Sequence, residues 1–313
     1  MIAPSKQQIK QAVDLLESGE VVAFPTETVY GLGADASNEK AVAKIYAIKG
    51  RPSFNPLIFH VKDLESAQKI GHFSETALKL AHAFWPGPLT LVVQKAQDAQ
   101  VSMLATAGLE TIAIRVSSHP VFQEILQDFG KPIVAPSANP SGFLSSTNAS
   151  HVVRNLGKKV SLILDGGPCA KGLESTIIDA TPEHPTVLRY GALPVIEIEQ
   201  FLQHSVRKKD QVDAIKAPGQ LKNHYAPRLP LRMNATECLP GEIFLGFGPI
   251  AYSPWNLSDS GNLIEAASRF FAYLHMLDAS DLYIGIAVAP IPEQGLGLAI
   301  NDRLRRAAAP KEL

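Results

Sequence analysis

Apolar residues recur along the chain with two different spacings, which predict a mixture of helices and short strands. Residues 5–18, 38–48, 74–84 and 119–129 show the spacing of amphipathic helices. Short apolar runs predict buried strands at residues 21–24, 57–61, 89–94, 111–116, 133–135, 161–165, 174–179 and 186–189. Because these helices and strands alternate in a mixed order, we expect an α/β domain with a twisted mixed sheet.

The pattern changes after residue 202. Residues 204–216 are polar and basic and the sequence APGQLKNHYAP follows them, so we expect an interdomain linker over residues 204–230. The linker would separate a larger domain at residues 1–203 from a smaller one at 231–313. The smaller domain shows expected strands at 242–247 and 282–288, and expected helices at 262–277 and from about Ala299. This order predicts a Rossmann-like open sheet with a crossover.

Composition narrows the class of protein. The chain has 313 residues, more than a single hydrophobic core usually holds, which supports two domains. Its 29 basic and 30 acidic residues give a net charge of -1, so overall charge does not favour a nucleic-acid or acidic-membrane binder, although a local basic cleft stays open. Cys169 and Cys238 are far apart and lack zinc-ligand spacing, which argues against a zinc site or a disulfide scaffold.

The N-terminal residues are amphipathic and charged throughout, which is not the pattern of a secretory signal. No apolar run approaches the ~20 residues that a membrane-spanning helix needs. We therefore expect a cytoplasmic protein that does not enter a membrane.

The segment between the second predicted helix and the next strand carries candidate chemistry. Lys49 and Arg51 follow an apolar helical run, and Pro52 stops that helix. A lone Lys at a helix C-terminus often serves only the helix dipole, and this alternative stays open. Asn55 follows closely, however, and the next strand ends beside His60. Two cations, an amide and an imidazole at the mouth of a sheet predict an anion pocket.

Two polar turns follow predicted strands, at residues 26–28 and 137–139. Ser, Asn and Pro are ordinary turn formers, so a purely structural role is the alternative. Ligands bind where the strands of α/β sheets end, which makes both turns candidate parts of one cleft. After the first turn, Gly31 and Gly33 predict a bend in the chain.

Arg115 is informative because it interrupts the apolar strand TIAIRV. An unpaired buried cation costs on the order of several kcal/mol, so Arg115 must have an anionic partner or face a cavity. The partner is either a structural carboxylate or a ligand carboxylate. The second choice would imply an amino acid substrate.

Five motifs occur in the order seen in one known family. They are PTETVYGLG, Lys49-Gly50-Arg51 with Asn55-Pro56-Leu57, WPGPLT, Ser137-Ala138-Asn139 and Ser175-Thr176-Ile177. With them the chain resembles the threonylcarbamoyl-AMP synthases, the YrdC/Sua5-like proteins. The sequence LGLAINDRLRRA resembles the C-terminal signature of the longer, Sua5-type members. The resemblance implies a YrdC-like domain with a twisted mixed sheet, followed by a smaller Sua5 domain.

The resemblance also implies an activity: ATP-dependent synthesis of L-threonylcarbamoyladenylate from L-threonine and bicarbonate or CO2, with release of pyrophosphate. The product would feed threonylcarbamoylation of adenosine in tRNA, and direct contact with tRNA is left open. No Walker loop occurs, so side chains must hold the phosphates. A Mg2+ ion is expected to bind through the ATP phosphates, and no metal ligand is expected in the protein.

Roles are implied residue by residue. The implied catalytic residues are Lys49, Arg51, Ser137 and Asn139. The implied ATP contacts are Arg51, Asn55, Thr111, Ser137, Ser145, Arg189 and Asn223. The implied L-threonine contacts are Thr28, His60, Arg115, Ala135 through its backbone, and Ser175. Tyr225 would belong to a lid over the site. One departure is Ser117, where members of the family often have Pro.

Two rival functions stay open on the sequence alone. An RNA-binding protein would use the same cations to hold an RNA backbone. A transferase that consumes carbamoyl phosphate would need no bicarbonate or ATP. The C-terminal domain has no assigned role: it could order the linker, bind nucleotide or contact partners.

Overall fold

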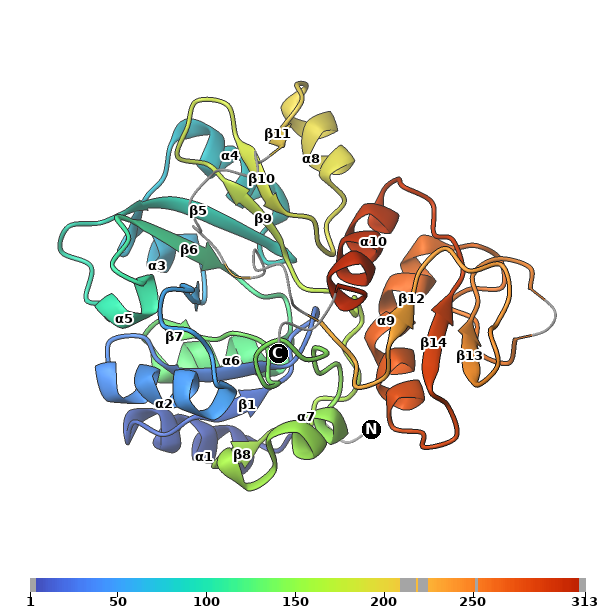
Figure 1. Cartoon of the computed structure of the whole chain (residues 1–313). Helices are drawn as coiled ribbons and strands as arrows, with labels where there is room; N and C mark the ends of the chain where they lie inside the picture. Colours follow the sequence, from blue (N-terminus) through green and yellow to red (C-terminus); the bar gives the residue numbers. More distant parts are fainter. Residues whose placement is uncertain (1–3, 209–217, 219–224, 251–252, 310–313) are drawn as a thin grey trace.

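A large and a small α/β domain lie side by side in the computed structural model (Figure 1). The structure describes residues 4–208, 218, 225–250 and 253–309. Asn223, an expected ATP contact, and most of the expected linker lie outside these ranges. None of the helices within them has both the length and the apolar character that crossing a membrane requires.

The large domain is built on one mixed sheet. Among the described residues eleven strands pair in the order β11-β10-β9-β5-β6-β3-β7-β2-β1-β8, with β4 beside β5. The strands are β1 (Val22–Phe24), β2 (Gly31–Asp35), β3 (Ile58–His60), β4 (Gly71–His72), β5 (Leu89–Lys95), β6 (Thr111–Arg115), β7 (Ile133–Val134), β8 (Leu162–Ile163), β9 (Thr176–Asp179), β10 (Thr186–Arg189) and β11 (Arg207–Lys208). β3 and β6 are parallel, whereas β5 and β6 are antiparallel, so the predicted mixed sheet is confirmed.

Helices cover this sheet. They are α1 (Lys6–Glu17), α2 (Glu39–Lys49), α3 (Leu64–Gln68), α4 (Glu75–Phe84), α5 (Met103–Thr106), α6 (Pro120–Phe129), α7 (Ala149–Leu156) and α8 (Val195–Leu202), with the 3-10 turn η1 (Gly157–Lys159). Local signals account for their ends. The side chain of Asn38 caps α2, and Gly50, with φ 59°, ends it in the left-handed conformation. The chain therefore turns sharply between Lys49 and Arg51.

The two faces of the sheet differ because side chains alternate along each strand. One face carries Phe59, Leu91 and Ile114 into the largest core, together with α2, α3 and α4. On the opposite face, α1 and α6 cover apolar residues of β1 and β7. His60 and Arg115 are register partners on β3 and β6 and lie on this second face. The candidate site lies here, beside α6.

One expectation was wrong. Gly31 and Gly33 do not form a bend but lie in strand β2. A Cβ atom on Gly33 would lie 2.3 Å from a ring carbon of Phe24 and 2.9 Å from Ile133. The glycines are needed because the ring of Phe24 lies across the strand, not because the chain turns.

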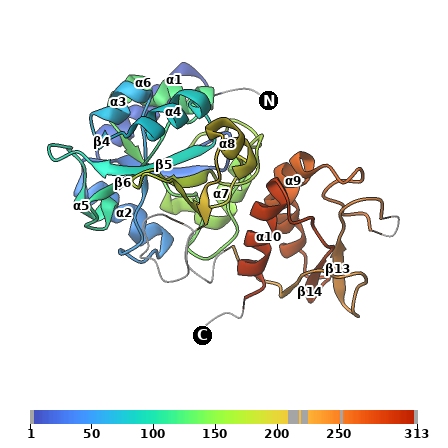
Figure 2. The same ribbon diagram turned by 90° about the horizontal axis from the view of Figure 1, so that it is seen from above.

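The small domain contains β12 (Leu231–Arg232), β13 (Glu242–Leu245), α9 (Leu263–Asp278), β14 (Gly285–Val288) and α10 (Leu296–Ala307). Its described strands form a parallel sheet in the order β12-β14-β13, with α9 crossing from β13 to β14, as predicted. α10 begins three residues before Ala299. Figure 2 shows α9 and α10 between the small sheet and the large domain.

The domains approach each other closely at Gly172. A Cβ atom there would lie 2.3 Å from the carbonyl oxygen of Ala267 and 2.6 Å from Cα of Ser268, both on α9. Nearby, Nε2 of His275 donates a hydrogen bond to the carbonyl oxygen of Ser145 at 3.0 Å.

The large sheet also extends to β11, which lies beyond residue 203, the expected end of the large domain.

Candidate active site

A cavity opens on the second face of the large sheet, with about 540 Å³ of space when the part open to solvent is included. Predicted site residues that line it are Thr28, Arg51, His60, Arg115, Ala135, Ser137, Ser175, Arg189 and Tyr225. These residues come from segments far apart in the sequence. The fold therefore brings most of the predicted site together.

The two predicted turns meet at this cavity. The backbone N–H of Leu32 donates to the carbonyl oxygen of Pro136, and that of Ala138 donates to Tyr30, both at 2.8 Å. Gly31 and Ser137 also form an isolated bridge. The chain that follows the turn at residues 26–28 thus runs beside the turn at 137–139.

Lys49 supports one of these turns. Its Nζ donates to the carbonyl oxygens of Ser137 at 2.6 Å and Asn139 at 2.5 Å. Burial, with a contribution from the charge of Arg51, lowers the pKa of Lys49 well below its usual value. Lys49 is not among the residues that line the cavity. It fixes the backbone that presents Ser137.

Asn139 lies in the same turn and is fully buried. Its Nδ2 donates to the carbonyl oxygens of Pro140 at 2.8 Å and Phe143 at 3.0 Å. Its Oδ1 is buried and makes no hydrogen bond to the described residues. In this geometry Asn139 holds the end of the turn rather than lining the cavity.

Arg51 brings a cation to the cavity wall. Its Nε donates to the carbonyl oxygen of Asn55 at 3.2 Å, and Nη2 donates to that of Pro56 at 2.9 Å. Burial lowers the pKa of Arg51 to about 10, so the guanidinium stays charged at neutral pH. The side-chain amide of Asn55 is buried and makes no hydrogen bond to the described residues.

Arg115 has a structural carboxylate as its partner, which answers the question left by its sequence. Nη2 of Arg115 lies 2.7 Å from Oε1 of Glu27, and both side chains are buried. Burial alone would raise the pKa of Glu27, but Arg115 and a hydrogen bond from Ser117 hold it down to about 2. Glu27 is therefore ionised, and its part in the site was not predicted. Arg115 still lines the cavity.

His60 lies beside this pair. Burial and the charge of Arg115 lower its pKa to about 3, so its imidazole is neutral at physiological pH. Nδ1 is buried and makes no hydrogen bond to the described residues. The ring contacts the edge of Phe122 on α6, with the centroids 5.2 Å apart. His60 is thus a fixed neutral polar group at the cavity wall.

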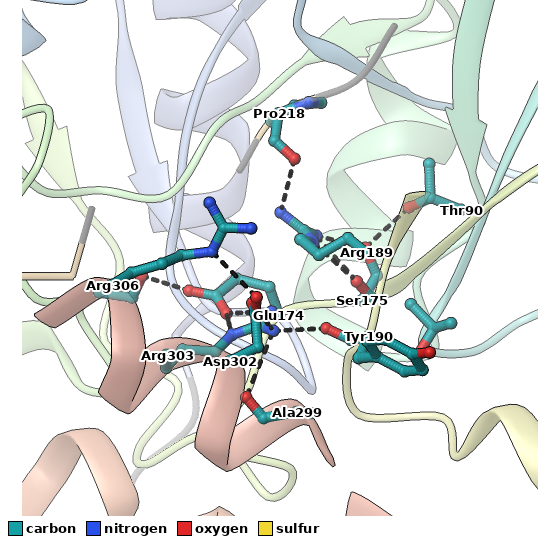
Figure 3. A network of polar contacts seen from close by, with 12 residues as sticks. Thr90, Glu174, Ser175, Arg189, Tyr190, Pro218, Ala299, Asp302, Arg303 and Arg306 are labelled. Carbon is teal, nitrogen blue, oxygen red and sulfur yellow. Dashed lines mark hydrogen bonds and ion pairs between the residues drawn. The ribbon is translucent and has the colours of Figure 1, made fainter. Parts of the chain in front are cut away.

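Arg189 and Ser175 form another part of the cavity wall, and Figure 3 shows the contacts between them. Nη2 of Arg189 donates to the carbonyl oxygen of Ser175 at 2.8 Å and to its Oγ at 3.1 Å. The hydroxyl groups of Ser175 and Thr90 lie 2.8 Å apart. Burial lowers the pKa of Arg189. Arg189 therefore fixes the position of Ser175.

The small domain reaches this wall through Arg303 on α10, as Figure 3 shows. Nε and Nη2 of Arg303 donate to Oε2 of Glu174 at 3.1 and 3.0 Å. The other carboxylate oxygen of Glu174 accepts a hydrogen bond from Oγ of Ser145 at 2.5 Å. Glu174 lines the cavity, whereas Ser145, an expected ATP contact, lies behind it. Sequence reasoning missed both Glu174 and Arg303.

Tyr225 is buried between the two domains and lines the cavity. Its ring centroid lies 5.3 Å from the guanidinium carbon of Arg303, which is a cation–π distance. Thr111 is different, because it begins β6 while Arg115 ends it. Four residues of extended strand span roughly 13 Å. Thr111 is not among the residues that line the cavity.

The charges around the cavity are unevenly balanced. Glu27 is paired with Arg115, and Glu174 with Arg303. No carboxylate in the described part of the chain forms an ion pair with Arg51 or Arg189. The described residues also contain no group of three or more His, Cys, Asp or Glu side chains arranged to bind a metal. The cavity wall therefore carries an excess of positive charge, which suits an anionic ligand.

Comparisons with known proteins agree with this architecture. A Sua5/YciO/YrdC family model, described as telomere recombination, matches residues 14–191. The model for the C-terminal domain of threonylcarbamoyl-AMP synthase matches residues 193–309.

Full-length relatives have the same extent. A threonylcarbamoyl-AMP synthase of Pyrococcus abyssi is 38% identical and aligns with 96% of this chain and 94% of its own. One from Bacillus subtilis is 39% identical, with 98% and 94% covered. The crystal structure of P. abyssi Sua5 complexed with L-threonine has a TM-score of 0.90 and 36% identity, and the match covers 97% of this chain and 95% of that one. The chain belongs to the family of threonylcarbamoyl-AMP synthases and has the two domains of its Sua5-type members.

Proposed function

We propose that this protein is an L-threonylcarbamoyladenylate synthase, which forms threonylcarbamoyl-AMP and pyrophosphate from L-threonine, bicarbonate or CO2, and ATP. The observation that carries the proposal is the single cavity that contains Arg51, Arg115 and Arg189 together with Ser137 and Ser175. Family membership and the L-threonine in the P. abyssi Sua5 crystal structure support it.

Threonine would bind around Arg115. The guanidinium suits the threonine carboxylate, since Arg donors match carboxylate geometry. The predicted contacts Thr28, His60 and Ser175 line the same cavity and offer hydroxyl and imidazole groups. Because His60 is neutral, its imidazole can accept or donate a hydrogen bond without adding a second positive charge.

The ATP phosphates would bind near Arg51, Arg189 and Ser137, with Lys49 holding the turn that carries Ser137. Arg51 and Arg189 have no carboxylate partner among the described residues, so their charge is available to phosphate oxygens. Asn55, Asn139, Ser145, Thr111 and Asn223 remain predicted contacts. A Mg2+ ion would neutralise phosphate charge, and the cavity's donor set of arginines and hydroxyls leaves it to be held by the phosphates.

The chemistry needs positioning rather than a protein nucleophile. The threonine amine, after losing a proton to the medium, adds to CO2 and loses a second proton to the medium as the carbamate forms. A carbamate oxygen then bonds to the α-phosphorus of ATP as the bond to pyrophosphate breaks. Arg51 and Arg189 would neutralise charge on the phosphates while Arg115 fixes threonine, which accelerates the reaction by proximity and electrostatic stabilisation.

The product, a reactive mixed anhydride of AMP, would pass to the machinery that transfers threonylcarbamoyl groups to tRNA. Tyr225, which lies in the cavity wall, would belong to a lid over the site. Closure of this kind would protect the product from water.

The proposal is tested by incubating the protein with labelled ATP, threonine and bicarbonate in the absence of RNA. Pyrophosphate release that depends on threonine is expected. Activity with carbamoyl phosphate in place of bicarbonate and ATP would favour a transferase. RNA binding that weakens steeply with salt, without turnover, would favour an RNA-binding protein. Arg51→Ala should cut turnover strongly with little loss of folded protein, and equal losses of both would make Arg51 structural. Lys49→Ala should cut turnover and also lower stability, because two buried carbonyl oxygens of the turn that presents Ser137 lose their donor.

A further inference from the structure

Glu27 is an ionised side chain without an assigned role, buried directly behind the expected threonine contact Arg115. Its side chain is 8% exposed and that of Arg115 is 4% exposed. Arg115 lines the cavity, whereas Glu27 is not among the lining residues. The carboxylate is thus placed to act on the guanidinium rather than on a ligand.

The guanidinium of Arg115 is fixed at two of its three nitrogens. Nε donates to the carbonyl oxygen of Gly87 at 3.2 Å, and Nη2 lies 2.7 Å from Oε1 of Glu27. Nη1 makes no hydrogen bond to any residue in the described part of the chain. Because a guanidinium is planar, two fixed nitrogens determine where the third one lies.

Ser117 in turn fixes Glu27. Its Oγ donates to Oε2 of Glu27 at 2.5 Å, and its side chain is fully buried. The same Oγ accepts the backbone N–H of His119 at 3.3 Å, which begins the turn into α6.

We infer that Glu27 is a positioning residue for substrate, which orients the Arg115 guanidinium toward the carboxylate of threonine and is itself held by Ser117. This inference rests on the proposed function. The alternative is that Glu27 only balances the charge of Arg115. The two roles predict opposite changes in threonine binding when Glu27 loses its charge. If Glu27 orients Arg115, carboxylate binding weakens; if Glu27 only balances charge, Arg115 attracts a carboxylate more strongly.

The test compares Glu27→Gln and Ser117→Ala with wild type and with Asp35→Asn. Asp35 is a suitable control because it is buried in the same domain, accepts a hydrogen bond from Ser37 and pairs with Lys131, but does not line the cavity. Threonine binding is measured by calorimetry, and KM for threonine, KM for ATP and kcat are measured by pyrophosphate release.

Glu27→Gln should weaken threonine binding by about tenfold to a hundredfold, because Arg115 loses the buried ion pair that orients it, and leave KM for ATP within about twofold. Ser117→Ala keeps the charges of Glu27 and Arg115, and it should also weaken threonine binding, by a smaller factor. This variant tests the inference if Glu27→Gln does not fold. Asp35→Asn should change neither KM. Unchanged or tighter threonine binding in both variants would overturn the inference, whereas a wild-type protein that does not bind threonine would overturn the proposed function.

Discussion

Two buried Arg–Glu pairs flank the cavity, and they differ in how the arginine uses its donors. Arg115 pairs with Glu27 within the large domain, and Arg303 pairs with Glu174 across the domains. In each pair a serine hydroxyl donates to the second carboxylate oxygen, from Ser117 or from Ser145. The surroundings of the two carboxylates are thus alike.

The arginines are not alike. Arg303 is fully buried and also donates to the carbonyl oxygens of Tyr190 and Ala299 and to Asp302, so all three of its nitrogens are occupied. Arg115 lines the cavity with Nη1 not bonded to any described residue. The difference separates an arginine that joins two domains from one that keeps a donor for a ligand.

Arg115→Ala is expected to have the largest effect. It removes the expected carboxylate contact, so KM for threonine should rise by about a hundredfold or more while KM for ATP changes far less. It also leaves the charge of Glu27 buried and unpaired, which should lower the free energy of unfolding by about 3–5 kcal/mol. Steady-state kinetics and urea denaturation measure the two effects. A larger rise in the ATP requirement would refute the threonine assignment.

Arg303→Ala should lower the free energy of unfolding by a similar amount, about 3–5 kcal/mol, because Glu174 then lacks its partner. Its effect on KM for threonine should be much smaller than that of Arg115→Ala, since Arg303 does not line the cavity. The same two measurements apply. If both variants raise KM for threonine equally, the distinction between the pairs fails.

Acid should remove the stabilisation that Glu27 supplies. Its pKa is lowered from 4.5 to about 2 in the folded protein, so the contribution is present above about pH 4.5 and is lost as pH falls toward 2. A shift of this size corresponds to roughly 3 kcal/mol of unfolding free energy. Denaturation of wild type and Glu27→Gln between pH 7 and pH 3 measures it. A wild type that loses no more stability than the variant would contradict the expectation.

Ser145→Ala and Ser117→Ala should have the smallest effects on stability, about 1–2 kcal/mol each, since each removes one hydrogen bond to an ionised carboxylate. The two variants should differ in their effect on KM for threonine. Ser117→Ala should raise KM for threonine, whereas Ser145→Ala should leave it close to the wild-type value. The reverse ranking would place the ligand carboxylate at the domain boundary instead.

Sequence reasoning could predict Arg115 because a charge inside an apolar strand demands a partner. It could not name Glu27, because the ion pair joins distant parts of the chain and depends on how β1 and β6 are placed in the sheet. Arg303 was missed for another reason. It lies in the helical run RLRR, where Arg305 and Arg306 have side chains 57% and 22% exposed while Arg303 has none of its side chain exposed. Only the packing of α10 separates these arginines.

The helices and strands also differed in how well the sequence predicted them. Long helices and strands with clear periodicity were predicted close to their observed bounds, since apolar spacing over many residues is a strong signal. α3, β4, α5, α7, α8, β11 and β12 were not predicted, because most are too short to show a period. The strand at Gly31 and Gly33 was mistaken for a bend, because the reason for the glycines is the ring of Phe24, which only the folded sheet brings there.

Gly172 stands two residues before Glu174 and touches the backbone of α9. Even one added carbon would clash with the backbone of α9 at this point, because a helix backbone cannot move aside as a flexible side chain can. Gly172→Ala would therefore shift α9, which also carries His275, relative to the large domain while every charge stays in place. This substitution would therefore show how the distance between the two domains affects activity, separately from the ion pair and hydrogen bonds that join them.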